Sequence, residues 1–440
     1  MQEFVIRGGR PLHGTVRANG AKNAALPIMA ASMLAEGTTV LHRVPRLSDV
    51  ETMAAILRAL GTELRWRDEH TLELRSAGTD VTVAPRELVR RMRASVCVLG
   101  PLLATRGAAA LPLPGGCVIG ERPIDLHLKG LRALGATIRE DEHQVYARAP
   151  ALRGTTVPMA GPRGSTVLGT ANVLMAACLA DGTTVIEHAA CEPEVQDLAH
   201  FLTSCGAQVD GIGTRTLTIT GCDHLQGCEH TLIPDRIEAG TYLIAGAITG
   251  GKVSVEDLRT DHMQATLRSM EQIGLEFGRD EDTLWAGRRR RLCAADITTY
   301  PYPGLPTDMQ PQLSALLALA EGTSTVTEGV YPDRFTHMSA MCRMGARMVR
   351  EGSRAVVRGV DRLSGTRVKA ADLRAGAALV LAGLAAEGVT TVQGVDQIDR
   401  GYENLEVVLG DLGADISRRE AEWAATPRLP AEGQELRRSA

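Results

Sequence analysis

The sequence predicts an α/β protein built from six repeated small α/β subdomains. Six segments follow one plan: a helix end, a glycine turn, a short β-branched strand, a variable loop, an amphipathic helix, a second glycine and another strand. The turn glycines recur roughly every 70 residues, a longer period than that of solenoid repeats. These turn glycines are Gly37, Gly107, Gly182, Gly251, Gly322 and Gly388.

The first repeat shows how the spacing predicts each element. Met53, Ile56, Leu57 and Leu60 lie three and four residues apart, which marks one face of a helix. Gly61 follows directly and is expected to end that helix as a C-cap glycine, before a strand. A unit of this size cannot bury its apolar faces alone, so the copies must pack together. The matching glycines of the other repeats are Gly135, Gly206, Gly274, Gly345 and Gly413.

A second set of helices is apolar and rich in small residues on every side. They are expected at 23–34, 170–179, 239–248 and 371–384. A helix that is hydrophobic all round is buried rather than laid on a surface. We therefore expect helices inside the domains and strands around them.

Composition excludes several classes of function. The formal charge of −4 and the pI near 6.3 create no bulk field that would hold the chain on nucleic acid or an anionic membrane. With 3% aromatic residues, stacking on nucleobases is not expected either, and the basic run GRRRRLC at 287–293 is interpreted as a solvated hairpin. The longest apolar run, near 375–386, is too short to cross a bilayer, and the amino terminus has no apolar signal core. Nine cysteines without a CxxC pair fit neither a disulfide framework nor a zinc site. We expect a soluble, cytoplasmic protein.

Two short stretches predict chemistry. In LPGGCVIGERPIDLH, residues 113–127, Cys117 lies among glycines and prolines that make a flexible loop with an exposed tip, where a thiol can react. Lys22 and Asn23 precede a buried apolar helix, so a cation and an amide lie at a helix N-terminus that attracts anions. The alternative is a solvated Lys22 with Asn23 as a helix cap.

Together with TDMQ at 307–310 and DRGYE at 399–403, these stretches resemble the UDP-N-acetylglucosamine 1-carboxyvinyltransferases of the enolpyruvyl transferase family, from about residue 2 to 416. The sister family, the 5-enolpyruvylshikimate-3-phosphate synthases, lacks the cysteine loop. The resemblance implies a two-domain inside-out α/β barrel of six subdomains. It places one discontinuous domain at 1–21 plus 234–418 and a second at 22–233 carrying the Cys117 lid loop. The end of the sequence, 419–440, is charged, contains prolines and lacks a long apolar pattern, so it is expected to be a disordered tail.

The resemblance also implies an activity. These enzymes transfer the enolpyruvyl group of phosphoenolpyruvate to the 3'-hydroxyl of UDP-N-acetylglucosamine by addition and elimination through a tetrahedral ketal, releasing phosphate. This is the first committed step of peptidoglycan precursor synthesis, and hence of cell wall biogenesis, cell shape and division. It implies small-molecule substrates, sensitivity to fosfomycin, and neither a metal nor an organic cofactor. The oligomeric state stays open.

The site residues follow from the same resemblance, position by position. The implied catalytic residues are Cys117 as general acid, Asp308 as base for the 3'-hydroxyl, Lys22 and Arg400. Asp308 could instead cap the following helix, because aspartate is favoured there. The residues implied for phosphoenolpyruvate are Lys22, Asn23, Arg122, Arg374 and Arg400. Those implied for UDP-N-acetylglucosamine are Arg93, Arg122, Pro123, Ile124, Asp125, Leu126, Thr166, Val167, Asp308 and Val330. Arg334 also falls in a matching context.

Some positions depart from the family pattern or stay ambiguous. Leu168 is bulkier than the glycine that the diphosphate segment usually has, and Gly164 replaces a lysine of some members, although Arg163 could supply that charge. For Asp372 and Glu192, ion pairing or capping is an equal interpretation. Two other functions stay open: transfer to a different acceptor, or a paralogue without activity. Lys22, Cys117, Asp308 and Arg400 are all kept, which argues against the inactive paralogue.

Overall fold

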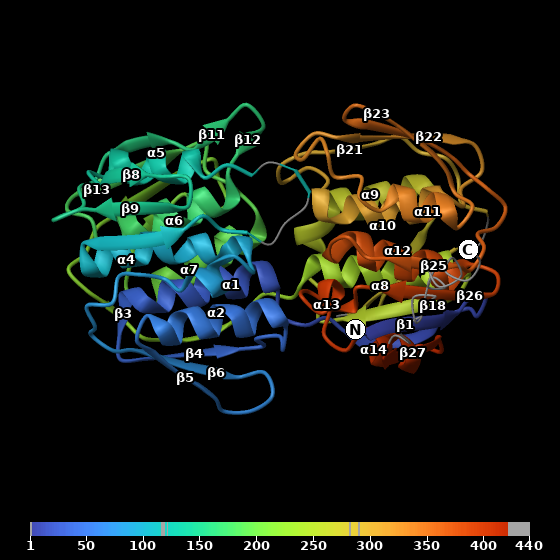
Figure 1. The fold of residues 1–440 in the computed structure, drawn as a ribbon, viewed down its shortest axis with the longest axis horizontal. Coiled ribbons are helices and arrows are strands. Elements are labelled where there is room, and N and C mark those ends of the chain that lie inside the picture. Colours follow the sequence, from blue (N-terminus) through green and yellow to red (C-terminus); the bar gives the residue numbers. More distant parts are fainter. Residues whose placement is uncertain (1, 116–118, 121, 281–282, 289–290, 421–440) are drawn as a thin grey trace, which may run out of the picture.

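A computed structural model describes residues 2–115, 119–120, 122–280, 283–288 and 291–420. It has two halves side by side, each with helices in its interior and strands around them (Figure 1). We call residues 22–233 the first half, and residues 2–21 with 234–420 the second half. The predicted mixed α/β fold with buried central helices is confirmed. Arg289 and Arg290 of the basic run lie outside the described residues.

The first half contains three repeats. Its helices are α1 (Lys22–Ala31), η1 (Ser32–Leu34), α2 (Ser48–Ala59), α3 (Arg86–Val89), η2 (Arg93–Val98), α4 (Leu99–Arg106), α5 (Asp125–Ala133), α6 (Val167–Ala177) and α7 (Pro193–Ser204). Its main strands are β4 (Thr38–His42), β5 (Thr62–Trp66), β6 (Leu72–Ser76), β7 (Ala108–Pro112), β8 (Thr137–Glu140), β9 (Gln144–Arg148), β10 (Thr156–Pro158), β13 (Thr183–Glu187), β14 (Gln208–Asp210), β15 (Thr216–Thr220) and β17 (Glu229–Thr231). Two short pairs join β3 (Ala35–Glu36) to β16 (Leu225–Gln226) and β11 (Ala160–Gly161) to β12 (Gly164–Ser165).

The second half contains the other three. Its helices are α8 (Arg236–Ile248), η3 (Thr260–Met263), α9 (Gln264–Ile273), η4 (Thr307–Met309), α10 (Gln310–Leu317), α11 (Met338–Arg343), α12 (Leu373–Ala385), α13 (Val395–Ile398) and α14 (Leu405–Asp411). Its strands are β1 (Gln2–Arg7), β2 (His13–Arg17), β18 (Lys252–Glu256), β19 (Glu276–Asp280), β20 (Thr283–Gly287), β21 (Ile297–Thr299), β22 (Thr323–Glu328), β23 (Arg347–Glu351), β24 (Arg354–Arg358), β25 (Arg367–Lys369), β26 (Val389–Gln393) and β27 (Asp415–Glu420).

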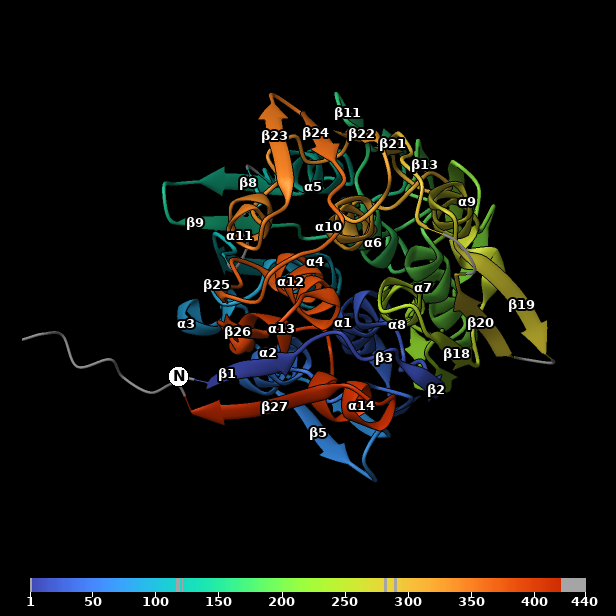
Figure 2. The same ribbon diagram turned by 90° about the vertical axis from the view of Figure 1, so that its right-hand side faces the viewer.

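Each repeat builds its own sheet by one topology. In the first repeat, β4, helix α2, β5 and β6 follow one another along the chain. The strand order in the sheet is β17-β4-β6-β5, with β17 parallel to β4. The same pattern gives β10-β13-β15-β14 and β21-β22-β24-β23. In the sixth repeat the order is β25-β26-β1-β27, so the N-terminal strand β1 takes the third strand's place (Figure 2). The start of the chain thus completes the last repeat.

The apolar helices fill the two interiors, as their all-round hydrophobicity predicts. Every residue of α8 is buried, and so is nearly all of α6 and α12. Such apolar helices invite a membrane interpretation, but no helix in the described part of the chain is both long and apolar enough to cross a bilayer. Their apolar surface is instead covered by neighbouring helices and sheets of the same half.

Buried apolar residues form two separate clusters. One runs from Ala21 to Leu232, and the other combines 4–18 with 237–412. On this basis we propose the domain limits 22–233 and 1–21 plus 234–418 that the resemblance implies. The last strand β27 continues to Glu420, two residues beyond the second limit, because it pairs with β1 up to Gln2. Residues 421–440 of the expected tail lie outside the described residues.

The predicted helix-ending glycines adopt the backbone that only glycine takes easily. Gly61 has φ of 89°, and the five matching glycines lie between 97° and 106°. The prediction was wrong at one turn glycine: the left-handed residue there is Gly250, with φ of 79°. Gly251 is needed for a different reason, since a Cβ on it would lie 1.9 Å from the Leu12 carbonyl oxygen.

Candidate active site

A buried ion cluster joins the two halves at the start of α1. Lys22 is the first residue of that helix, and its Nζ lies 3.1 Å from Asp49 Oδ2. Arg400, which follows α13 in the other half, places its Nε 3.0 Å from Asp49 Oδ1. Asp49 therefore forms an ion pair with each of the two cations, one through each carboxylate oxygen. The structure brings the two predicted residues together through a residue that sequence reasoning missed.

Asp49 was missed because its sequence context has a simpler interpretation. It stands in SDVE at the start of a helix, where serine, aspartate and glutamate commonly satisfy the first backbone N–H groups. No signal in that stretch connects it to residues 351 positions away. Only packing of α2 beside α1, with the 399–403 turn across the interface, gives the carboxylate its partners.

Burial and opposite charge act against each other in this cluster. Burial would raise the pKa of Asp49, but Lys22 and Arg400 outweigh it and lower that pKa. The pKa of Lys22 is also lowered, mainly by burial and further by Arg374 and Arg400, although Asp49 opposes the shift. A lysine whose ammonium is 8% exposed and close to two arginines is therefore strongly attractive to an anion.

Asp308 lies between two arginines in the second half. Its Oδ1 accepts from Arg334 Nη1 at 2.7 Å, and its Oδ2 accepts from Arg374 Nε and Nη2 at 3.1 and 3.0 Å. Burial would raise the pKa of Asp308, but the two arginines and Lys22 lower it well below its usual range. The capping alternative is not supported, because α10 has no side-chain cap. Asp308 is instead an ionised carboxylate that is 26% exposed.

The Lys22 and Asp308 clusters adjoin each other. Lys22 influences the pKa of Asp308, and Arg374 influences that of Lys22. Four cations therefore share two carboxylates, Asp49 and Asp308. Arg334 Nε and Arg374 Nη1 are buried and have no hydrogen-bond partner among the described residues. Donors in this state suit an anionic ligand with several oxygen atoms.

The residues predicted for the nucleotide lie at η2, at the turn before α5, at the start of α6 and, in the second half, next to Tyr331. Arg93 donates to the Pro123 carbonyl oxygen at 3.1 Å, which ties η2 to the turn before α5. Arg122, in that turn, places its guanidinium 5.0 Å from the ring centre of Tyr331 in the other half. Next to Tyr331, the Val330 amide donates to Glu328 Oε1 at 3.0 Å. The 122–126 turn thus faces the second half.

Thr166 lies at the start of α6. Its hydroxyl accepts from the Gly169 amide at 3.3 Å, so it caps α6, and Val167 is the first residue of that helix. Of the other predicted residues, Asn23 beside Lys22 and Leu126 in α5 are partly buried, and Asp125 at the start of α5 is exposed. Ile124 is buried. Cys117, the predicted acid, lies outside the described residues.

Two ambiguous carboxylates are now placed. Asp372 caps α12 through the Arg374 and Ala375 amides, at 3.0 Å each, so capping is its observed role. Glu192 accepts from the Tyr302 amide of the other half at 3.3 Å, and burial raises its pKa. Cys191, to which no role was assigned, is buried beside it.

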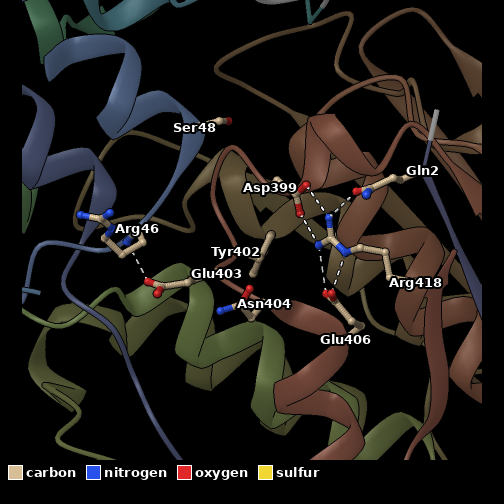
Figure 3. Close-up of a pocket in the computed structure, with 9 residues that line it drawn as sticks. All are labelled: Gln2, Arg46, Ser48, Asp399, Tyr402, Glu403, Asn404, Glu406 and Arg418. Atoms are coloured by element: carbon tan, nitrogen blue, oxygen red, sulfur yellow. Dashed lines mark hydrogen bonds and ion pairs between the residues drawn. The ribbon is translucent and has the colours of Figure 1, made fainter. Parts of the chain in front are cut away.

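The 399–406 segment that carries Arg400 is anchored from behind. Arg418 binds Asp399 and Glu406 at 2.6 to 3.0 Å, as Figure 3 shows. A pocket of about 420 Å³ opens there, and neither Lys22 nor Asp308 lines it. Its arginine charges are already paired or stacked, with Arg46 over the Trp66 ring at 3.9 Å. This pocket supports the position of Arg400 rather than offering a second anion site.

Metal-ligating side chains gather at one place in the described ranges. Glu69, His70 and Glu403 have ligand atoms within 4.8 Å of one another. Glu403 already accepts from the Arg46 amide at 2.8 Å and lies 3.2 Å from His70 Nε2. These contacts bridge the two halves and give the carboxylate a structural role without an ion.

Glu238 occupies the point where the chain first crosses between the halves. Its carboxylate accepts from the Asn19 amide at 2.8 Å, from Asn19 Nδ2 at 3.1 Å and from the Tyr242 hydroxyl at 3.0 Å. Burial, followed by the charge of Asp235, raises the pKa of Glu238 to about 7. The folded protein therefore retains this proton where the unfolded chain has lost it.

A raised carboxyl pKa makes stability fall with pH. Between pH 4.5 and about 7 Glu238 binds more protons in the folded state than in the unfolded state, so its contribution to the free energy of unfolding should decrease by on the order of 3 kcal/mol and then level off. Glu238→Gln should reduce this decrease, measured by urea unfolding at pH 5 and pH 8. The exposed Glu321→Gln serves as control. Equal slopes in both variants would contradict the assignment.

Comparison with known proteins shows which family the chain belongs to. The model of the EPSP synthase (3-phosphoshikimate 1-carboxyvinyltransferase) family matches residues 6–409. The enolpyruvyl transferase NikO from Streptomyces tendae superposes with a TM-score of 0.87 at 26% identity, over 96% of this chain and 99% of that one. EPSP synthase from Acinetobacter baumannii shares the fold, with a TM-score of 0.73 at 18% identity over 96% and 100%. The chain therefore belongs to the EPSP synthase family of enolpyruvyl transferases.

Within that family, the chain is similar over nearly its whole length to UDP-N-acetylglucosamine 1-carboxyvinyltransferases. The enzyme of that name from Methylacidiphilum infernorum (isolate V4) is 49% identical over 418 residues, which cover 95% of this chain and 99% of the relative. That from Myxococcus xanthus (strain DK1622) is 49% identical over 424 residues, covering 96% and 100%. The resemblance predicted from the motifs is confirmed.

Proposed function

We propose that the chain is an enzyme that transfers the enolpyruvyl group of phosphoenolpyruvate to the 3'-hydroxyl of UDP-N-acetylglucosamine and releases phosphate. The named relatives support the reaction. The observation that carries it is Asp308, kept ionised between Arg334 and Arg374 beside the ammonium of Lys22. A site for this reaction needs a carboxylate for the hydroxyl proton and several cations for the phosphate and carboxylate of the donor.

Each cluster has one task in this proposal. Lys22, Arg374 and Arg400 bind phosphoenolpyruvate, since their guanidinium and ammonium groups match its two anionic ends. Asp308 accepts the 3'-hydroxyl proton as the oxygen bonds to C2 of the enol ether. Cys117 supplies the proton to C3, a role that rests on the sequence resemblance. Loss of phosphate from C2 of the tetrahedral ketal, together with one proton from the C3 methyl group, then restores the double bond.

The acceptor is proposed to bind near the 122–126 turn and the start of α6. We assign the UDP part to Arg93, the 122–126 turn and the N-terminus of α6, where backbone N–H groups favour a diphosphate. Leu168 is in the first turn of α6 and only partly buried, so its larger side chain lies at the edge of the proposed nucleotide site. Val330 borders the sugar side beside Tyr331. Closure of the two halves would exclude water from the enol ether.

The reaction places the enzyme at the first committed step of peptidoglycan precursor synthesis. Its nucleotide substrate is a cytosolic metabolite, so we propose a cytoplasmic location and a dependence of cell shape and division on its activity. The groups given roles here are all side chains and backbone amides of the protein, and the proposal invokes neither a metal nor an organic cofactor. A different acceptor is less well supported, because relatives that are 49% identical over nearly the whole chain are named for UDP-N-acetylglucosamine.

Phosphate release tests this function. The purified chain should release phosphate from phosphoenolpyruvate only when UDP-N-acetylglucosamine is present, and the product should be the enolpyruvyl ether by mass. Fosfomycin should alkylate Cys117 and stop release, and Cys117→Ser should resist alkylation. Cys293→Ser, at an exposed thiol, is the control and should stay sensitive. A folded chain that releases no phosphate with this acceptor would refute the assignment.

A further inference from the structure

Two cysteine sulfurs of the first half lie in contact. Cys205 Sγ and Cys228 Sγ are 3.5 Å apart, although 23 residues separate them in sequence. Cys205 is buried at the end of α7, and Cys228 is partly exposed between β16 and β17. Neither residue belongs to the site described above.

The backbone on both sides fixes this contact. The Cys205 amide donates to Phe201 and Leu202, which sets it as the last residue of the helix turn. Its carbonyl oxygen accepts from the Gln226 amide at 2.9 Å, and the Cys228 carbonyl oxygen accepts from the Val40 amide at 2.9 Å. The two sulfurs must approach from 3.5 Å to about 2 Å to form a disulfide bond.

The two thiols differ in reactivity. The hydrogen bond from Cys205, with help from His230, lowers the pKa of Cys228 to about 7 despite some burial. The same hydrogen bond and burial raise the pKa of Cys205. A partly exposed thiolate reacts first with an oxidant, and a neighbouring protonated thiol then resolves the product.

The geometry points to a reversible oxidation site: we propose that a hydroperoxide converts Cys205 and Cys228 to a disulfide. The Cys228 sulfur attacks the peroxide O–O bond and becomes a sulfenic acid, and the peroxide leaves as water or an alcohol. The Cys205 thiol then attacks that sulfur, forms the S–S bond and releases water. Two electrons pass from the thiols to the peroxide, and a dithiol reductant returns them.

Nearby cysteines provide matched controls. Cys178 and Cys222 lie in the same region, but their sulfurs donate to carbonyl oxygens. The Cys178 sulfur donates to the Leu174 carbonyl oxygen, and the Cys222 sulfur donates to the Cys178 carbonyl oxygen, at 3.3 Å each. Cys293 and Cys342 are exposed, and their sulfurs also face carbonyl oxygens. Within the described ranges, the Cys205–Cys228 contact is the one sulfur–sulfur hydrogen bond.

Peptide mapping after mild oxidation tests the proposal. The full chain is treated with hydrogen peroxide, blocked with N-ethylmaleimide and cut with trypsin, which separates Cys205 in peptide 164–215 from Cys228 in peptide 216–236. We expect these peptides to be linked in the wild type and in the Cys178→Ser/Cys222→Ser control, and dithiothreitol to release them. The link should be absent from Cys205→Ser and Cys228→Ser.

The order of events is tested with dimedone, which labels sulfenic acids. Cys205→Ser should accumulate label on Cys228, whereas Cys228→Ser should leave Cys205 unlabelled. Linked peptides that persist in either single variant, or an oxidised wild type that carries no link, would overturn the proposal. Where a single variant does not fold, fragmentation of the linked peptides from the Cys178→Ser/Cys222→Ser control decides between Cys205 and Cys191, which lies in the same peptide.

Discussion

Replacing Asp308 by asparagine is expected to lower kcat by roughly 1,000-fold, within the range that one general base supplies. The amide cannot take the 3'-hydroxyl proton, yet it has nearly the same shape. The substitution also leaves Arg334 and Arg374 without their shared carboxylate, at 5% and 1% side-chain exposure. These two effects must be separated by experiment.

The kinetic pattern separates them. The donor is an anion, so removing a negative charge beside the two arginines should not raise the KM for phosphoenolpyruvate. A purely structural role would instead lower the melting temperature and raise KM together. Asp308→Asn is therefore compared in a steady-state phosphate assay with Glu387→Gln, which removes an exposed carboxylate paired with Arg362 at 3.2 Å. A loss of kcat below tenfold would exclude Asp308 as the base.

The low pKa of Asp308 has a further consequence for its role. A carboxylate that two arginines keep ionised is a weak base in the form described. If phosphoenolpyruvate binds Arg374 as proposed, its oxygens compete with Asp308 for that guanidinium group, and the charge on Asp308 is then less stabilised. Its basicity therefore rises as the donor arrives. This coupling would let the acceptor hydroxyl be activated only beside a bound donor.

Local sequence predicted the repeats and their boundaries, because each rests on neighbouring residues. Apolar spacing in the first repeat and the helix-ending Gly61 were enough for α2 and its C-cap. Gly251 was misassigned because adjacent glycines share one turn, and only the backbone shows which is left-handed. The position of β1 between β26 and β27 depends on a pairing across the whole chain, which the repeat pattern implies only when the sixth copy lacks a strand.

The site residues also fall into two groups, those that sequence motifs predicted and one that they did not. Lys22, Asp308, Arg374 and Arg400 were found through motifs that match a family, and the structure places them in adjoining clusters. Asp49 could not be found, because a helix start explains it fully in local terms. Its function arises from contact with two cations that reach it from different elements. Residues of this kind are visible only after folding.

Lys22→Met should lower kcat/KM for phosphoenolpyruvate by about 30-fold or more, since removing one partner of a buried charged contact costs about 2 to 5 kcal/mol. Methionine keeps much of the apolar stem, and Arg400 still pairs with Asp49, so the fold should persist. Lys129→Met, at an exposed lysine that donates to the Pro158 carbonyl oxygen, is the control and should leave kcat/KM unchanged.

The pH profile distinguishes a charge role from a packing role for Lys22. Burial, Arg374 and Arg400 lower the pKa of Lys22, so the free enzyme loses this proton at a lower pH than an ordinary lysine does. Because kcat/KM reports the free enzyme, its alkaline decline should begin below the usual lysine range in the wild type. Lys22→Met should lose this contribution and keep only the decline that comes from the Cys117 thiol, the proposed general acid, whose ordinary pKa is about 8.5. An unchanged alkaline limb in Lys22→Met would show that another group titrates, and that the ammonium of Lys22 is not what binds the donor.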